Sequence, residues 1–201
     1  MRESPEALGF GGENHWLFED FDHDDTAGQT TALLEGYARA GFLSFPSMKD
    51  PSAARTTAEI VTFIEPEALA RWAGTRWMRR GADYEALKAR MGQALLDLAE
   101  RNFPGFGALV DYWEVSTPLT VESFTGYHSG GFAELAVTPE RLRRRLSRVR
   151  TPIAGLYLTG ADVCSLGILG AAMGAVFSAG AVLGPAGIPQ IMRAARHPAT
   201  A

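Results

Sequence analysis

The stretch Gly155-Leu-Tyr-Leu-Thr-Gly160-Ala-Asp162-Val-Cys-Ser-Leu-Gly167-Ile-Leu-Gly170-Ala-Ala-Met-Gly174 combines a short apolar segment, a tight turn and a run of small residues. Residues 156–159 are predicted to form a β-strand, because they are apolar and lie between two glycines. The turn places the carboxylate of Asp162 just beyond this strand. Ligands of open α/β sheets bind at that end of the strands, so we expect a ligand site at the turn.

The residues after the turn predict a helix that starts at Gly167 and presents small side chains along one face. The small residues recur at helical spacing: Gly170, Ala171, Gly174, Ala175 and Ser178. Without bulky side chains, the backbone of this helix can approach a sheet or a flat ligand closely. Its first N–H groups and the positive end of its dipole would then point at that ligand.

Strand, turn and helix together resemble the C-terminal flavin-binding signature of the phytoene desaturase and retinol saturase family of FAD-dependent oxidoreductases. Upstream segments resemble the family's substrate-domain elements in the same order: residues 42–51, 57–62, 71–77, 83–88, 115–120 and 124–126. The resemblance implies a mixed α/β fold. In this fold, a substrate-domain sheet with covering helices precedes the last strand and helix of a Rossmann-like FAD-binding domain. We therefore expect a partial substrate-binding domain over 1–150, the FAD-binding segment over 151–190 and a tail over 191–201.

The resemblance also implies which residues contact FAD. They come from the turn and from the start of the helix: Gly160, Ala161, Asp162, Gly167, Ile168, Leu169 and Gly170. The turn is expected to contact the ribityl and phosphate part of the cofactor. The helix start is expected to face the pyrimidine edge of the flavin, where its partial positive charge would stabilise the anionic reduced form.

The implied substrate is a long apolar isoprenoid such as a carotenoid or a retinoid, with a carbon–carbon bond that is desaturated, saturated or isomerised. Tyr127 and His128 are candidates for contacts with this substrate, although an ordinary surface loop also explains them. The resemblance identifies no catalytic residue. Five aromatic residues are candidates for an apolar tunnel or, more simply, for a hydrophobic core: Trp16, Phe42, Phe45, Trp72 and Trp77.

The family's Gly-x-Gly-x-x-Gly turn, which holds the FAD pyrophosphate, is not found in the sequence. The nearest string, residues 9–14, has Asn14 at the position of the third glycine, and a strand-like segment follows it. We therefore expect the C-terminal half of a flavoenzyme that binds FAD weakly or not at all by itself. Its expected partner is a separately encoded N-terminal half or a second copy of the chain. The alternative is a non-catalytic fragment that binds an apolar ligand or a protein partner.

The composition bounds the environment of the chain. The net charge is −4 at pH 7, which gives no general attraction to nucleic acid. The single cysteine, Cys164, excludes an internal disulfide, and the N-terminus has no signal-like apolar run, so we expect a cytoplasmic protein. The acidic residues 19–25 match no calcium or zinc spacing and are interpreted as a solvated turn. No metal site is expected.

Two segments allow a membrane interpretation. Residues 163–192 carry no charge, which is compatible with a bilayer span, but a buried helix explains the same residues. Residues 138–150 predict a helix capped by Thr138, with Pro139 in its first turn and arginines on one side. Those arginines form either a solvated face or a peripheral contact with anionic lipid headgroups.

The remaining pattern predicts strands at 15–21, 41–46, 56–65 and 112–117, because short apolar blocks alternate with Gly, Pro, Asp and Ser. Helices are predicted at 29–40, with Tyr37 turned inward, and at 66–77. A longer helix is predicted from an Asp83 cap to the Pro104-Gly105 pair.

Overall fold

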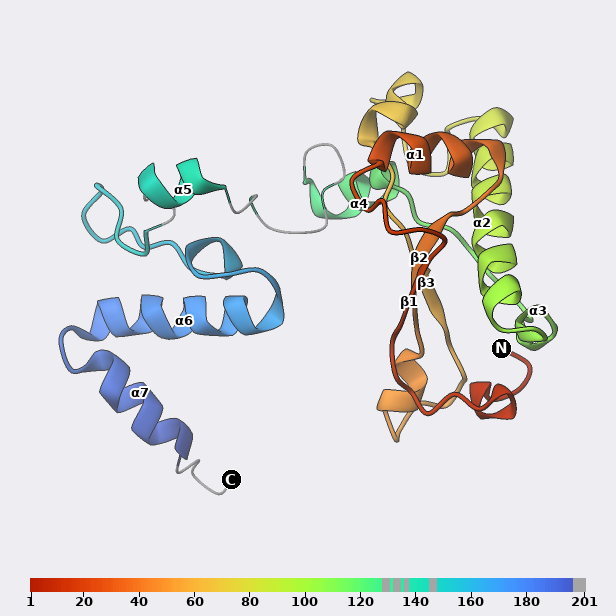
Figure 1. Ribbon diagram of the computed structural model, residues 1–201. Coiled ribbons are helices and arrows are strands. Elements are labelled where there is room, and N and C mark those ends of the chain that lie inside the picture. The colour runs from red at the N-terminus through yellow and green to blue at the C-terminus, as the bar shows by residue number, and fades with distance from the viewer. Residues whose placement is uncertain (128–130, 132–134, 136–137, 145–147, 197–201) are drawn as a thin grey trace. The chain divides into compact units, whose positions relative to one another are not determined.

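The computed structural model of the chain describes residues 1–127, 131, 135, 138–144 and 148–196. Backbone contacts divide the chain into two compact units, Met1–Gly130 and Gly131–Ala201, and each is described by itself (Figure 1). The mixed α/β fold class is confirmed. The two units differ in charge: residues 1–130 contain 20 acidic and 11 basic side chains, and residues 131–201 contain 3 and 8.

The first unit contains a three-stranded antiparallel sheet in the order β1-β2-β3. Its strands are β1 (His15–Phe18), β2 (Ala40–Ser44) and β3 (Glu59–Val61). β1 and β3 lie within the predicted segments 15–21 and 56–65, and β2 begins one residue before the predicted segment 41–46. Trp16, Phe42 and Val61 occupy one row across the sheet.

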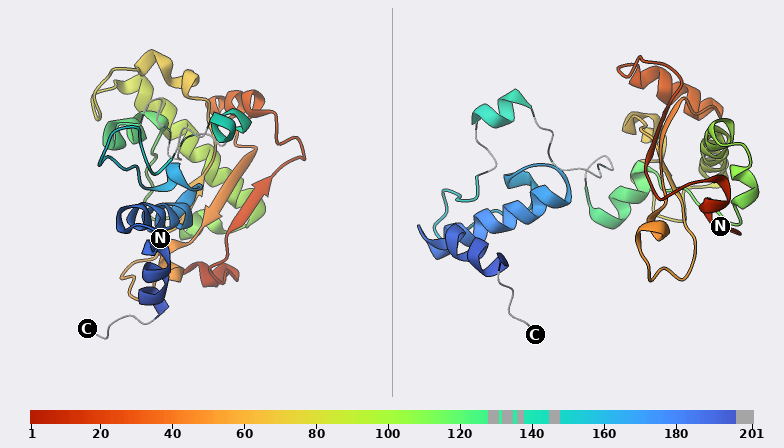
Figure 2. Two further views of the ribbon diagram at one scale, coloured as in Figure 1. Left: turned by 90° about the vertical axis from the view of Figure 1, so that its left-hand side faces the viewer. Right: turned by 60° about the horizontal axis from the view of Figure 1, so that its bottom comes forward.

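The two faces of this sheet differ because side chains alternate along each strand. Leu17 and Leu43 are buried on one face, and helix α2 (Ala82–Asn102) packs against β2. The same helix lies beside the sheet in all three views (Figures 1 and 2). Trp16 and Phe18 are exposed on the other face. The core of the first unit therefore lies between the sheet and α2.

The long helix α2 confirms the predicted periodicity, since Met91, Ala94 and Leu98 are buried along one face. Its N-cap residue is Gly81, so the prediction that Asp83 caps the helix was wrong. With φ of 93°, Gly81 adopts a conformation that a glycine allows without strain. Asp83 lies in the first turn, where a carboxylate is also favourable.

Helix α1 (Thr26–Glu35) begins three residues earlier than predicted, because Asp25 caps it by accepting a hydrogen bond of 2.9 Å from the Gly28 N–H. Gly36 ends the helix in the left-handed region. Tyr37 therefore lies outside the helix and is about half exposed, which corrects its predicted inward position.

The other helical elements are short, with the exception of α6. In the first unit they are η1 (Pro5–Leu8), η2 (Pro46–Lys49), η3 (Pro66–Trp72), α3 (Phe106–Leu109) and α4 (Pro118–Thr125). In the second unit they are α5 (Pro139–Arg144), η5 (Ala161–Val163), α6 (Gly167–Leu183) and α7 (Gly187–Arg196). The predicted cap of α5 is confirmed, because the Thr138 hydroxyl accepts a hydrogen bond from the Arg141 N–H.

Two predicted strands were wrong. Residues 112–117 form neither a strand nor a helix, and Trp113 and Val115 pack instead against Gly92 of α2. Residues 156–159 form only a single bridge, between Tyr157 and Arg150, with a 2.8 Å hydrogen bond from Leu158 N to the Val149 carbonyl. A strand needs a neighbouring strand to pair its backbone groups. The described part of the chain supplies no neighbouring strand to either segment.

The uncharged stretch 163–192 is divided by Gly184, which ends α6, so that α6 and α7 are separate helices. Over the described residues, no helix has the length and apolar character needed to cross a membrane.

Candidate functional site

The turn after residue 159 has the geometry that its glycine predicts. Gly160 has φ of 93° and ψ of −171°, a conformation available to glycine and costly for other residues. It precedes η5, in which Ala161 is buried and Asp162 is partly exposed. The turn therefore depends on Gly160 for its shape and on Ala161 for its packing.

Helix α6 approaches this turn as closely as its small residues predict. A side chain on Gly174 would overlap the carbonyl oxygen of Gly160. The Ser178 hydroxyl donates to the carbonyl oxygen of Leu158 at 2.7 Å and of Gly174 at 2.8 Å. The small face of α6 is thus occupied by residues 158–160 of the same chain.

The start of α6 is open on its outer side. Leu166 is the N-cap residue and provides no side-chain hydrogen bond. The next two apolar side chains, Ile168 and Leu169, are 92% and 77% exposed. Gly170 is buried, and a Cβ there would overlap the backbone of Ser165. The exposed outer residues contrast with the closely packed inner ones, so the free surface of this helix end lies on the side of Ile168 and Leu169.

Asp162 is held by two neighbours in the second unit. One of its carboxylate oxygens accepts a 2.9 Å hydrogen bond from the Leu135 N–H and lies 3.9 Å from Nη2 of Arg141. The same Arg141 nitrogen donates to the main-chain carbonyl of Asp162 at 2.5 Å. Arg141 also donates to the carbonyl oxygen of Leu135. The carboxylate that the sequence assigns to a cofactor is therefore tied to these two residues.

Of the two candidate substrate residues, Tyr127 is described and lies in the other unit. Tyr127 follows α4 and is about half exposed, and its N–H donates to the Thr125 hydroxyl at 3.2 Å. Gly126 ends α4 in the left-handed region. His128 lies outside the described residues. The structure thus gives Tyr127 an exposed position at the end of α4.

The five candidate tunnel aromatics fall into two groups. Phe45 and Trp72 belong to the buried clusters of the first unit, as the simpler interpretation predicts. Trp16 and Phe42 contact one another on the exposed sheet face, with ring centroids 4.8 Å apart. Trp77 is exposed and lies edge-on to Phe124.

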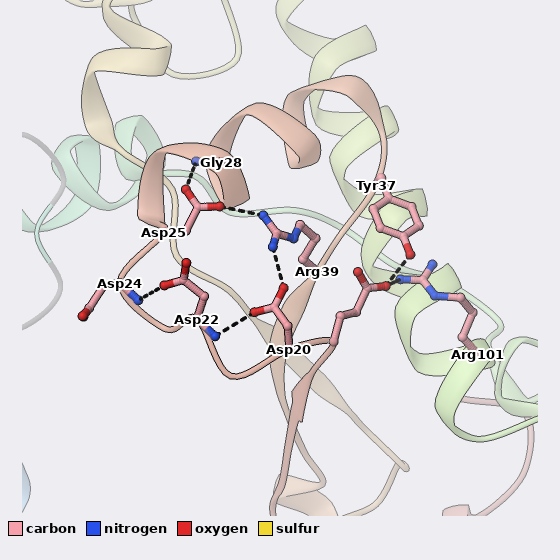
Figure 3. A network of polar contacts seen from close by, with 9 residues as sticks. Asp20, Asp22, Asp24, Asp25, Gly28, Tyr37, Arg39 and Arg101 are labelled. Carbon is pink, nitrogen blue, oxygen red and sulfur yellow. Dashed lines mark hydrogen bonds and ion pairs between the residues drawn. The ribbon is translucent and has the colours of Figure 1, made fainter.

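The acidic segment 19–25 is folded around an arginine that the sequence analysis did not single out. Arg39 donates to Asp20 at 2.5 Å and to Asp25 at 2.8 Å (Figure 3). These hydrogen bonds hold the pKa of both carboxyls below the usual range, and they raise the pKa of Arg39. Among the described residues, no group of His, Cys, Asp and Glu is arranged to hold a metal ion. The segment is a turn organised around Arg39.

A second ionic contact lies beside this turn. Glu19 accepts a hydrogen bond from the Tyr37 hydroxyl and one of 3.3 Å from Arg101 of α2 (Figure 3). The hydrogen bond to Glu19 raises the pKa of Tyr37. The turn after β1 is therefore connected to α2 as well as to the residues just before β2.

The known proteins reported below as similar to this chain share the name all-trans-retinol 13,14-reductase. No family model and no solved structure matches the sequence. The chain is 27% identical over 195 residues to the all-trans-retinol 13,14-reductase of Rattus norvegicus, and this match covers 91% of the chain but 32% of that protein. The Homo sapiens protein of the same name is 26% identical with the same coverage. An inactive all-trans-retinol 13,14-reductase of Danio rerio is 29% identical over 148 residues, 71% of the chain and 24% of that protein. The chain spans about a third of the length of the first relatives.

Proposed function

We propose that this chain is the C-terminal part of an FAD-dependent oxidoreductase that acts on carbon–carbon bonds of a retinoid or a related apolar isoprenoid. The observation that carries the proposal is the similarity over 91% of the chain to proteins named all-trans-retinol 13,14-reductase. The turn and helix at 160–170 support it, because they combine a glycine-dependent bend with a helix start that has no side-chain cap.

The residues at this turn fit a flavin in their donors and in the space around them. Apart from neighbouring residues along the chain and the backbone of α6 itself, no described atom lies within 4 Å of the position where a Cβ would stand on Gly160 or Gly167. Main-chain N–H groups at a helix start are suitable donors for an electron-rich ligand edge. Gly160, Ala161 and Asp162 would hold the ribityl and phosphate part, and the segment from Gly167 to Gly170 would face the ring. A bound flavin supplies the hydride chemistry, and the exposed Ile168 and Leu169 would exclude water from that ring.

Flavin binding, in this proposal, needs a second polypeptide that carries a nucleotide-binding βαβ unit, or else a second copy of the chain. The exposed Leu156 and Leu158 support this requirement, because residues 156–159 make only one bridge within the described chain. Tyr127 and His128 are proposed to contact the apolar substrate. The arginines after Thr138 are proposed to make the peripheral contact with anionic lipid through which such a substrate would be reached.

The test is retention of flavin. The purified chain, alone and coexpressed with a polypeptide that supplies a Gly-x-Gly-x-x-Gly unit, is passed through gel filtration, and its flavin absorbance is compared with its protein absorbance. We expect no flavin on the chain alone and stoichiometric flavin on the complex. Stoichiometric flavin on the chain alone would overturn the requirement for a partner, and its absence from both samples would overturn the assignment of FAD.

The role of Asp162 is tested in the same complex. Asp162→Ala is expected to weaken flavin retention about tenfold, in line with the loss of one charge-assisted contact. Asp111→Ala is the matched control, because this exposed carboxylate is paired with Arg2 in the first unit. Equal retention by the two variants would show that the turn does not bind the cofactor.

A second function, the binding of an apolar ligand or a protein without catalysis, is favoured by one observation. One relative is named an inactive all-trans-retinol 13,14-reductase and is 29% identical to this chain. The two functions differ in turnover: a complex that retains flavin and binds all-trans-retinol without consuming it would support the second.

A further inference from the structure

Arg80 is a buried cation of the first unit. The residue is only 7% exposed, yet it forms no ion pair with any described carboxylate. Its Nη2 donates to the carbonyl oxygen of Leu119 and to the hydroxyl of Ser123, both at 2.8 Å. Its Nε is buried and has no hydrogen-bond partner. Buried charges are normally paired, whereas no described carboxylate pairs with this guanidinium.

The residues that contact Arg80 directly, Leu119, Ser123 and Tyr84, are uncharged. Its guanidinium carbon lies 5.3 Å from the centre of the Tyr84 ring, and the Tyr84 hydroxyl is hydrogen-bonded to Thr117 at 2.6 Å. Tyr84, Leu119 and Trp72 belong to one buried cluster that joins η3, α2 and α4. The arginine is therefore held in place by elements that do not neutralise its charge.

Two exposed aromatic residues, Trp77 and Phe124, contact one another and adjoin the residues around this arginine along the chain. Ser123, which Arg80 contacts, precedes Phe124, and Phe124 is 66% exposed. Trp77, three residues before Arg80, is half exposed, and its ring lies 5.0 Å from that of Phe124 at 72°. Met78, which follows Trp77 in the sequence, has φ of 59° and is also exposed. Residues with a side chain rarely adopt this φ, and here it accompanies a turn closed by a hydrogen bond from Arg79 N to the Arg76 carbonyl.

We propose that Arg80, Trp77 and Phe124 form a binding site for a carboxylate carried by an apolar chain. The guanidinium matches the planar geometry of a carboxylate, and the two aromatic rings offer a surface for the apolar part. That the apolar part of the ligand is a polyene rests on the proposed function. That the ligand ends in a carboxylate is inferred from Arg80. The site lies entirely in the first unit and close to Tyr127, the candidate substrate residue at the end of α4.

The experiment compares two probes that share one polyene. All-trans-retinoic acid and all-trans-retinol are titrated into the full chain at pH 8, where the acid is ionised, and quenching of tryptophan emission is followed. We expect the acid to bind on the order of tenfold to a hundredfold more tightly, as for a hydrogen bond to a charged group. Equal binding of acid and alcohol, or no binding of either, would overturn the proposal. Acetate, which has a carboxylate but no apolar chain, is used as a competitor to measure the contribution of the carboxylate alone. We expect acetate to displace retinoic acid only at concentrations far above that of retinoic acid.

Variants assign the preference to residues. Arg80→Met should bind acid and alcohol equally, and Arg80→Lys should keep part of the preference because it keeps the charge. Arg79→Met is the matched control, since Arg79 is exposed on the same turn. A preference that survives in Arg80→Met, or that is lost in Arg79→Met, would contradict the assignment.

A pair of phenylalanine variants covers the case in which Arg80→Met does not fold. Phe124→Ala should weaken the binding of both probes about tenfold, whereas Phe21→Ala, an exposed phenylalanine elsewhere in this unit, should not. Equal effects of the two would overturn the site. The result is independent of flavin: a carboxylate preference in the chain, together with the absence of flavin from both the chain and the coexpressed complex, would leave this site standing and reject the proposed function.

Discussion

Arg39 is the residue that holds the acidic turn after β1 in place, because it is hydrogen-bonded to Asp20 and Asp25 at the same time. Replacing it by methionine leaves two carboxylates close together without a cation. We expect Arg39→Met to lower the Tm by a few degrees at pH 7, as followed by circular dichroism. Arg55→Met, at an exposed arginine of the same unit, should leave the Tm unchanged.

The effect of Arg39 depends on pH with a definite sign. The pKa of Asp20 and of Asp25 is lower in the folded chain than its ordinary value of about 3.9. Their ion pairs therefore stabilise the fold fully above the unfolded pKa and lose this effect as the pH falls through the folded pKa. The Tm difference between wild type and Arg39→Met should shrink below about pH 4. A constant difference from pH 7 to pH 3 would show that the charges are not its cause.

Gly174 is the residue whose replacement tests the contact between α6 and the Gly160 turn. Gly174→Val places a side chain where the Gly160 carbonyl lies, and overpacking of this kind costs about 1–3 kcal/mol. Ala172→Val adds the same branched side chain on the exposed side of α6 and should cost less. Hydrogen exchange at residues 158–160 is the measurement, and equal exchange in the two variants would contradict the observed packing.

At the scale of elements, the helix α2 carries the core of the first unit. Leu98 is buried in it and contacts the cluster that also contains Leu17, Leu33 and Met91. Leu98→Ala should lower the free energy of unfolding by about 2–5 kcal/mol. Leu169→Ala, at an exposed leucine of α6, should change it by less than about 0.5 kcal/mol. Urea denaturation of both variants checks the difference, and similar values would place the core elsewhere.

The elements that the sequence predicted correctly are those with a local cause. The four- and three-residue spacing of Met91, Leu95 and Leu98 is sufficient to predict α2, and the small face of α6 is visible from its glycines. The strands at 112–117 and 156–159 were wrong because strand formation depends on a neighbour, which residue spacing does not reveal. The sequence did not indicate Asp25 as a cap. It is one of five acidic residues in the segment 19–25, and the sequence does not show which of them caps the helix.

The candidate site was predictable only in part. The bend at Gly160 and the close approach of α6 follow from glycines whose role is local. The partners of Asp162 could not be foreseen, because Leu135 lies 27 residues away along the chain. Arg80 gave no signal either: an arginine in a sequence is expected at the surface, and its burial results from the packing of η3, α2 and α4.

At the scale of the whole molecule, the two units differ in how they are held together. The hydrophobic clusters found among the described residues all consist of side chains from the first unit. In the second unit, glycines and Ser178 of α6 are buried while its leucines are mostly exposed. Protection from hydrogen exchange follows burial. We expect amides of α2 to exchange at least tenfold more slowly than those of α6, and equal rates would contradict this difference.

The unequal charges of the two units affect how the protein is retained by ion-exchange columns. An acidic surface over residues 1–130 binds anion-exchange resin at neutral pH, and a basic surface over residues 131–201 binds cation-exchange resin. The intact polypeptide should therefore be retained by both column types at low salt, although its isoelectric point of about 5.6 suggests only the first. Limited proteolysis near Gly130 would send the two products to opposite columns.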